Sequence, residues 1–131
     1  MAQTAKRILI VDDDTSIFPL LQSVLSDESR ILLTAPTLTK AREILQTEPV
    51  DLLLLDLYLP DGSGINFLSD LKKNAEIAKQ PRAIIMTAFG DWESHVKAYR
   101  LGAFYYLDKP FKVTQLRILV EQALSANGQP S

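Results

Sequence analysis

The stretch Arg7-Ile-Leu-Ile-Val-Asp-Asp-Asp14 joins a short apolar run to three consecutive carboxylates. Such a run is typical of a strand that is buried on both faces of a parallel sheet. Asp56, Thr87 and Lys109 also follow apolar runs at their carboxyl ends. If all of these runs are parallel strands, the polar side chains gather at the carboxyl edge of one sheet. Open α/β sheets bind their ligands at this edge.

The rest of the chain alternates short apolar runs with segments of helical periodicity. The pattern predicts strands at residues 8–11, 31–34, 51–55, 83–86 and 103–107. It predicts helices at residues 17–25, 38–45, 65–71, 92–101 and 113–124, and a Pro- and Gly-rich loop at 58–64. Pro19 requires the first helix to start late or bend. Strict alternation of this kind indicates an α/β fold with a parallel sheet covered by helices on both faces.

The size and composition are those of a single globular domain. The chain has 131 residues, no cysteine and a net charge of −2. We expect one domain over residues 1–125 and a flexible tail, or the start of a linker, at 126–131. The charge balance argues against nucleic-acid binding by this domain. No signal peptide or membrane-spanning segment precedes the first strand, so we expect a cytoplasmic protein without membrane contact.

The carboxylates Asp12, Asp13 and Asp14 admit two explanations. A helix cap needs only one of them, and nothing in a cap rewards the repulsion among three adjacent negative charges. A bound hard cation would offset this repulsion, because Mg²⁺ prefers oxygen ligands and often takes only one or two carboxylates. From these residues alone, the metal site and the cap remain open.

Asp56 ends a nearly uncharged strand, where a charge is costly unless it is paired or faces a crevice. The alternative is that Asp56 only forms a turn. Asp61 fills that role better, because Pro60 and Gly62 flank it. A carboxylate beside a bound cation can instead act as a nucleophile and form an aspartyl phosphate.

Thr87 and Lys109 have ordinary explanations as a strand residue and a solvated lysine. Small Ala88 follows Thr87, so the threonine hydroxyl has room to donate to a phosphoryl oxygen. Pro110 restricts the backbone before it, so Lys109 is held at a strand end, from which its ammonium can reach a phosphate. The case for a phosphoryl site rests on the joint occurrence of these residues on successive strand ends.

Four segments together resemble the motifs of response-regulator receiver domains. The segments are Ile8-Leu-Ile-Val-Asp-Asp-Asp14, Asp56-Leu-Tyr-Leu-Pro-Asp-Gly62, Met86-Thr-Ala88 and Tyr106-Leu-Asp-Lys-Pro-Phe111. The resemblance runs from about Lys6 to Leu124. It implies a flavodoxin-like three-layer sandwich of five helices around a five-stranded parallel sheet of order 2-1-3-4-5.

The resemblance also implies a site and a function. Asp56 would accept a phosphoryl group from a sensor histidine kinase or a phosphotransfer protein. Mg²⁺, or Mn²⁺ in its stead, would be held by Asp12, Asp13, Asp56 and the backbone carbonyl of Tyr58. Thr87, Ala88 and Lys109 would contact the phosphoryl group, and Thr87 and Tyr106 would form the switch. The chain would be a signalling switch and not an enzyme, catalysing only its own phosphorylation and dephosphorylation.

The switch would act on the face formed by helix 92–101, strand 103–107 and helix 113–124. This face would serve an output domain, a downstream protein or a homodimer. Ile118 and Leu119 widen the apolar stripe of the last helix, which suits such a contact or a wide core-facing stripe equally well. We interpret His95, the only histidine, as a surface or partner-facing residue and not as a metal ligand.

Two other functions remain open. A haloacid-dehalogenase-like phosphatase would use Asp12 as its nucleophile, but the chain has only Glu121 as a late acidic residue after Lys109 and leaves the segment after Asp56 unexplained. A pseudo-receiver would bind partners without phosphorylation. The residue that becomes labelled separates these readings, because the phosphatase would carry the phosphoryl group on Asp12 and the receiver on Asp56.

Overall fold

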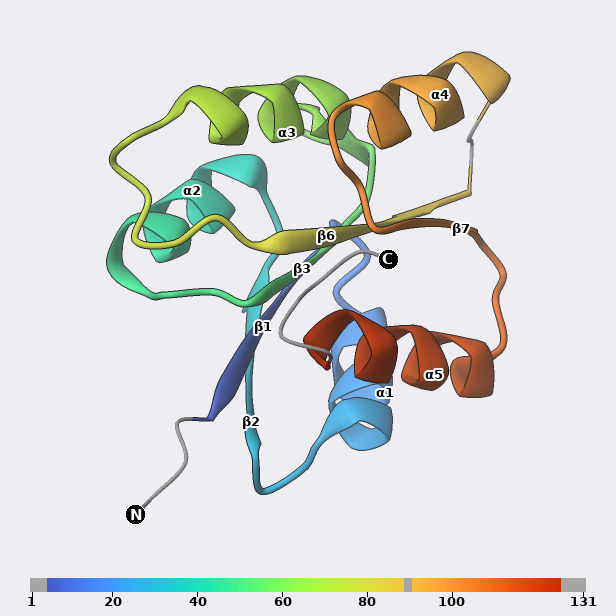
Figure 1. The fold of residues 1–131 in the computed structure, drawn as a ribbon. Coiled ribbons are helices and arrows are strands. Elements are labelled where there is room, and N and C mark those ends of the chain that lie inside the picture. The colour runs from blue at the N-terminus through green and yellow to red at the C-terminus, as the bar shows by residue number, and fades with distance from the viewer. Residues whose placement is uncertain (1–4, 89–90, 126–131) are drawn as a thin grey trace.

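The computed structural model describes residues 5–88 and 91–125, and its centre is one parallel sheet (Figure 1). Across the described residues this sheet has five strands in the order β2-β1-β3-β6-β7, all paired in parallel. Their bounds are Lys6–Val11 (β1), Arg30–Ala35 (β2), Leu52–Leu55 (β3), Arg82–Thr87 (β6) and Tyr105–Asp108 (β7). The predicted strand order is therefore confirmed, with β6 and β7 as the fourth and fifth strands.

Helices cover both faces of the sheet. Within the described residues there are five: Ile17–Leu25 (α1), Leu38–Thr47 (α2), Gly64–Lys73 (α3), Trp92–Arg100 (α4) and Val113–Leu124 (α5). Figure 1 shows α1 and α5 on one face and α2, α3 and α4 on the other. This three-layer arrangement confirms the flavodoxin-like fold. None of the helices in the described part of the chain is long and apolar enough to cross a bilayer.

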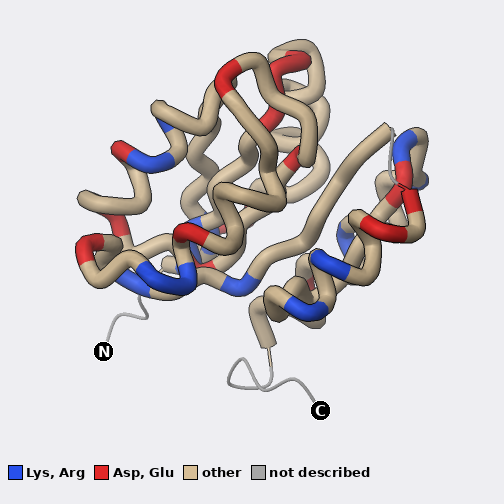
Figure 2. Tube along the Cα trace, turned by 90° about the horizontal axis from the view of Figure 1, so that it is seen from above, with Lys and Arg blue, Asp and Glu red and all other residues tan. Residues whose placement is uncertain are grey.

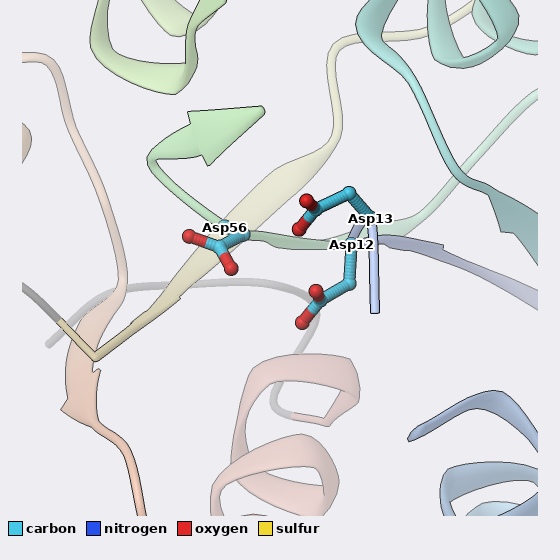
Figure 3. A group of neighbouring side chains, drawn as sticks. All are labelled: Asp12, Asp13 and Asp56. Atoms are coloured by element: carbon cyan, nitrogen blue, oxygen red, sulfur yellow. The ribbon is translucent and has the colours of Figure 1, made fainter. Parts of the chain in front are cut away.

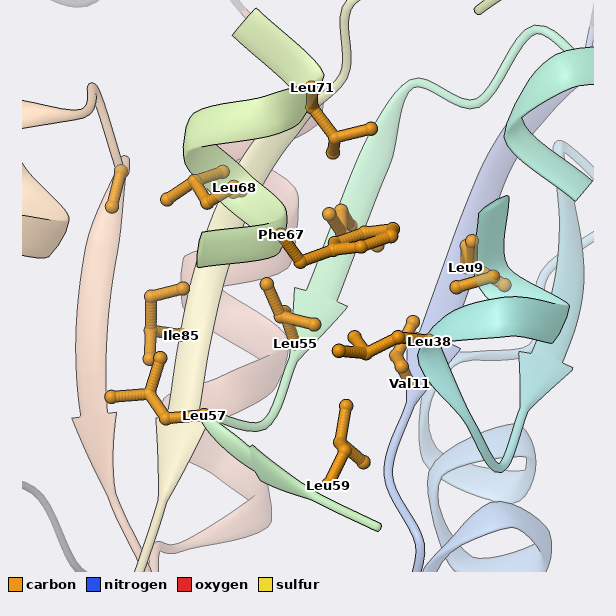
Figure 4. Close-up of a cluster of buried hydrophobic side chains, with 14 of the residues drawn as sticks. Leu9, Val11, Leu38, Leu55, Leu57, Leu59, Phe67, Leu68, Leu71 and Ile85 are labelled. Atoms are coloured by element: carbon orange, nitrogen blue, oxygen red, sulfur yellow. The ribbon is translucent and has the colours of Figure 1, made fainter. Parts of the chain in front are cut away.

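Strand β3 explains why the sheet needs helices on both sides. Its four leucines are all buried, and successive side chains of a strand point to opposite faces. Leu53 and Leu55 join the core under α2, α3 and α4, in which Figure 4 labels Leu55. Leu52 and Leu54 join the core under α1 and α5. Each buried leucine contributes roughly 2 kcal/mol, so neither face of this strand could be left in water.

The segment after β3 differs from the predicted loop. Residues 58–63 form a small antiparallel hairpin, β4 (Tyr58–Leu59) with β5 (Gly62–Ser63). Two residues in each strand are too few to produce a readable alternation in the sequence. The hairpin leads directly into α3, whose N-cap Ser63 accepts a hydrogen bond from the Asn66 amide.

The ends of two helices follow from single residues, and the prediction for Pro19 is confirmed. Pro19 lies in the first turn of α1, where its missing N–H would have no intrahelical acceptor. Thr37 caps α2 by accepting a hydrogen bond from the Lys40 amide, at 3.1 Å. The predicted tail at 126–131 lies outside the described residues, and the boundary at 125 stays a prediction. Figure 2 shows acidic and basic residues interspersed over helices and loops, in keeping with the small net charge.

Candidate functional site

The register of the sheet brings the predicted residues to one edge. Val11 pairs with Leu55, so the residues that follow them, Asp12 and Asp56, leave the sheet side by side. The Asp56 amide donates to the Val11 carbonyl at 3.0 Å and fixes this alignment. On the other side, the Lys109 amide donates to the Thr87 carbonyl at 2.9 Å. The carboxyl ends of β1, β3, β6 and β7 thus supply one crevice.

Three carboxylates meet in this crevice. Oxygen atoms of Asp12, Asp13 and Asp56 all lie within 4.8 Å of one another (Figure 3). Asp12 is fully buried and Asp56 nearly so, whereas Asp13 is exposed. Clustered hard oxygen ligands with one open side fit a divalent cation that keeps part of its water shell. The donor set therefore fits Mg²⁺ or Mn²⁺. Tyr58, whose backbone carbonyl is the fourth predicted ligand, lies two residues beyond Asp56 at the start of β4.

Lys109 supplies the compensating positive charge. Its Nζ donates to Asp12 Oδ2 at 2.5 Å and to Asp56 Oδ2 at 3.0 Å. Burial alone would lower the pKa of the Lys109 ammonium, but its hydrogen bonds to both carboxylates outweigh burial and raise it. The lysine therefore stays charged in the crevice. Its peptide bond to Pro110 is cis.

Burial dominates the electrostatics of Asp12. It raises the pKa of this carboxyl, and the bonds from Lys109 and from the Asp14 amide, at 3.0 Å, offset burial only in part. Proximity of the Asp56 charge adds to the increase. The crevice thus holds more negative charge than one lysine balances, which is the condition under which a bound cation stabilises a site.

The backbone around Asp56 is tightly packed. Its Oδ1 accepts a hydrogen bond from the Tyr58 amide at 3.1 Å, which orients the carboxylate from the hairpin side. The first residue of α3, Gly64, donates its amide to the Leu57 carbonyl at 2.8 Å. A Cβ on Gly64 would lie 2.4 Å from the Asp56 carbonyl oxygen, so only glycine allows this approach.

Thr87 and Ala88 stand at the end of β6, as predicted. Thr87 is fully buried and Ala88 is exposed at the rim. Beside the crevice, Ala88 and Lys109 also line an apolar groove of about 360 Å³. The other lining residues come from α1, from the segment before α5 and from the first residue of α5: Ile17, Leu20, Pro110, Phe111 and Val113.

Tyr106 is buried, with 6% of its surface exposed to solvent. Its ring stacks on the ring of His95, with centroids 4.5 Å apart and planes 4° apart. His95 also contacts Trp92 and Tyr99 at 5.8 Å and 5.1 Å between centroids. Burial raises the pKa of Tyr106 to about 12, and its hydroxyl has no hydrogen-bond partner among the described residues.

The structure differs from the sequence interpretation at His95 and Asp61. His95 is half-buried and holds the Tyr106 ring, so it is more than a surface residue. Asp61 is more than a turn former, because its carboxylate accepts hydrogen bonds from the first amides of α2, 22 and 23 residues away in the chain. The sequence shows an acidic residue in a loop, but it does not show that this loop lies beside the amino end of α2.

Comparison with known proteins gives a consistent family. Residues 8–121 match the family model described as "Response regulator receiver domain". The chain is 36% identical over 119 residues to the response regulator protein PilR of Pseudomonas aeruginosa, covering 91% of this chain and 26% of PilR. It is 35% identical to sporulation initiation phosphotransferase F of Bacillus subtilis, covering 91% of this chain and 94% of that protein.

A solved structure agrees with these matches. The beryllofluoride-activated NtrC4 receiver domain dimer superposes with a TM-score of 0.80 at 33% identity, covering 90% of this chain and 95% of the other. The chain spans about a quarter of the length of PilR and nearly all of phosphotransferase F.

Proposed function

Since the chain belongs to the response regulator receiver domain family, we propose that it is a signalling switch that accepts a phosphoryl group on Asp56. The observation that carries the proposal is the position of Lys109 Nζ, 2.5 Å from Asp12 and 3.0 Å from Asp56, beside three clustered carboxylates. A nucleophile, a metal-binding acid pair and a cation for the phosphoryl oxygens thus share one crevice.

The donor in this proposal is a phosphohistidine on a sensor histidine kinase or a phosphotransfer protein. A carboxylate oxygen of Asp56 attacks the phosphorus, the P–O bond forms and the P–N bond breaks. The imidazole leaves with the electron pair of that bond and takes a proton from water. Asp56 is suited to the attack because its carboxyl group lies 3.0 Å from the Lys109 ammonium, at the carboxyl edge of the sheet.

Asp12, Asp13 and Asp56 would hold Mg²⁺ or Mn²⁺ together with the Tyr58 carbonyl. Such an ion supplies positive charge that offsets the phosphoryl oxygens and orients them. Lys109, Thr87 and the Ala88 backbone would bind those oxygens, with Lys109 exchanging its contact to Asp56 for one to the phosphoryl group. The same ammonium then neutralises charge both before and after transfer.

The switch is proposed to run from Thr87 to Tyr106. Phosphorylation adds charge and strong acceptor oxygens next to the buried Thr87 hydroxyl. Movement of Thr87 toward them frees space that the Tyr106 ring can fill. Because Tyr106 stacks on His95 of α4, a change in that ring reaches the face formed by α4, β7 and α5. The modification shifts the two states only by its differential interaction with them.

That face is proposed as the output surface. It exposes Trp92, Tyr99 and Ile118, at 77%, 42% and 54% of their areas. An apolar surface of this kind suits a partner protein, an output domain or a second copy of the chain. The NtrC4 receiver domain, a relative at 33% identity, is described as a dimer. PilR is far longer than this chain and phosphotransferase F is close to it in length, so the partner of this face is either an attached output domain or a separate protein.

The test is phosphorylation by acetyl phosphate with and without Mg²⁺, followed by intact mass. We expect a single phosphoryl adduct that requires Mg²⁺ and is lost in Asp56→Asn. Absence of an adduct, together with absence of any response to beryllofluoride, would leave a pseudo-receiver as the function. A beryllofluoride response without an acetyl phosphate adduct would indicate a receiver that accepts phosphate only from its protein donor.

A further inference from the structure

We propose that Asp61 is a positioning residue for the phosphoryl site, holding the β4–β5 hairpin so that the hairpin orients the Asp56 carboxylate. The inference rests on the proposed function of Asp56. Asp61 lies outside the crevice, where the tip of the hairpin contacts the amino end of α2.

Asp61 binds the start of α2 with both carboxylate oxygens. Oδ1 accepts from the Leu38 amide at 2.9 Å, and Oδ2 accepts from the Thr39 amide at 2.9 Å and the Thr39 hydroxyl at 2.8 Å. The first amides of a helix have no acceptor within the helix. Among the described residues, the Thr37 side chain accepts from the Lys40 amide, whereas Asp61 accepts from the two preceding amides of the helix, those of Leu38 and Thr39.

These bonds also hold the carboxylate in its charged form. The pKa of Asp61 lies below its usual value because the Leu38 and Thr39 amides and the Thr39 hydroxyl all donate to it. A negative charge at the amino end of a helix is further stabilised by the helix dipole. The hairpin tip is therefore tied to α2 throughout the neutral pH range.

The hairpin connects this tie to the phosphoryl site. Its strands pair only Tyr58 with Ser63 and Leu59 with Gly62, and Pro60 and Asp61 form the turn. A two-stranded hairpin is marginal on its own, so its orientation depends on outside contacts. At the base of the hairpin, the Tyr58 amide donates to Asp56 Oδ1 at 3.1 Å. Release of the tip would therefore loosen the amide that orients Asp56.

The consequence is local to the metal site. A carboxylate that rotates freely has lost part of its preorganisation for Mg²⁺, and loss of such supporting contacts costs metal sites about 10- to 100-fold in affinity. The Tyr58 carbonyl, on the same hairpin, would be loosened with it. Asp61 thus acts on the site only through the hairpin, since its own carboxylate is engaged by α2.

The test compares Asp61→Ala with Thr37→Ala in the whole chain. Both variants remove a cap from the same helix, but only Asp61→Ala releases the hairpin. Mg²⁺ affinity is measured by calorimetric titration with MgCl₂, and the acetyl phosphate labelling rate is measured at saturating Mg²⁺. We expect both variants to unfold at lower urea concentration, and only Asp61→Ala to lose about tenfold in Mg²⁺ affinity and to label more slowly.

Asp61→Asn serves as the conservative variant, because its single oxygen can still accept from one of the two amides. We expect it to retain part of the Mg²⁺ affinity, and it replaces Asp61→Ala if the alanine variant does not fold. Equal Mg²⁺ affinities for the wild type and the Asp61 variants would overturn the inference while leaving the proposed function intact. A wild type that neither binds Mg²⁺ nor labels would refute the proposed function and the inference with it.

Discussion

In the absence of metal, the Asp13→Asn variant should have a higher unfolding free energy than the wild type. In the presence of Mg²⁺, it should have a lower one. Asp13 is exposed and contributes a carboxylate oxygen within 4.8 Å of those of Asp12 and Asp56. Two unit charges 4.8 Å apart repel by about 3.5 kcal/mol at an effective dielectric constant of 20 and by about 0.9 kcal/mol in bulk water. Because Asp13 faces solvent and Lys109 offsets part of the charge, we expect a gain of about 1 kcal/mol in unfolding free energy.

Magnesium should reverse this order. An ion that binds only the folded state stabilises it by about 2.7 kcal/mol at a concentration 100 times its dissociation constant. The wild type should receive this full increment. Asp13→Asn has lost one carboxylate ligand and should receive much less of it. The stability curves of the two proteins therefore cross as Mg²⁺ is added.

The assay is urea unfolding followed by far-UV circular dichroism, once in EDTA and once in saturating MgCl₂. Asp14→Asn is the matched control, because it removes the same charge one residue away. Asp14 accepts hydrogen bonds from Ser16 and lies outside the three-carboxylate cluster, so this variant should gain as much from Mg²⁺ as the wild type. If Asp13→Asn is less stable than the wild type in EDTA, the three carboxylates do not repel one another as described. If Mg²⁺ stabilises both proteins equally, Asp13 is not a metal ligand.

Three further outcomes are expected. Gly64→Ala should lower the unfolding free energy by about 2 kcal/mol in urea titrations, since its Cβ would lie 2.4 Å from the Asp56 carbonyl oxygen; an unchanged midpoint would contradict the packing argument. The pKa of Asp51 is lowered because bonds from the Lys79 ammonium and the Arg7 amide outweigh its burial. Its stabilising contribution is present above the unfolded pKa and lost as pH falls, so Asp51→Asn should flatten the loss of stability between about pH 5 and pH 2, and an equally steep loss would count against it. Because burial raises the pKa of Tyr106 to about 12, an absorbance titration should show one tyrosine ionising near that pH. The unfolding free energy should fall as pH rises above the usual tyrosine pKa of about 10, because only the unfolded state then releases the proton. If the ionisation near pH 12 persists in Tyr106→Phe, it belongs to another tyrosine.

The strands and the main site residues could be predicted because their signals are local. Each apolar run is long enough to identify a buried strand, and a parallel sheet sends every strand end to the same edge. Asp12, Asp56 and Lys109 meet for this reason alone. In the register that makes Asp12 and Asp56 neighbours, Val11 pairs with Leu55, and these are the last residues of two apolar runs that both end in an aspartate.

Other features depend on contacts that the sequence does not display. The hairpin is too short to show a period, and Asp61 reaches an amide of α2 that lies 23 residues earlier in the chain. The stacking of His95 on Tyr106 arises from the packing of α4 against β7, and a lone histidine on a helix has no pattern that predicts it. The need for glycine at position 64 likewise cannot be predicted from the sequence, because it arises from the close approach of the Asp56 carbonyl oxygen.

The most direct test of the central claim is to identify which aspartate carries the phosphoryl group. The protein is labelled with acetyl phosphate and Mg²⁺, the aspartyl phosphate is reduced with borohydride, and the modified residue is located by peptide mass spectrometry. We expect modification at Asp56 alone, with none in Asp56→Asn. Modification at Asp12 would contradict it and favour phosphatase chemistry, in which the buried carboxylate now paired with Lys109 is the nucleophile.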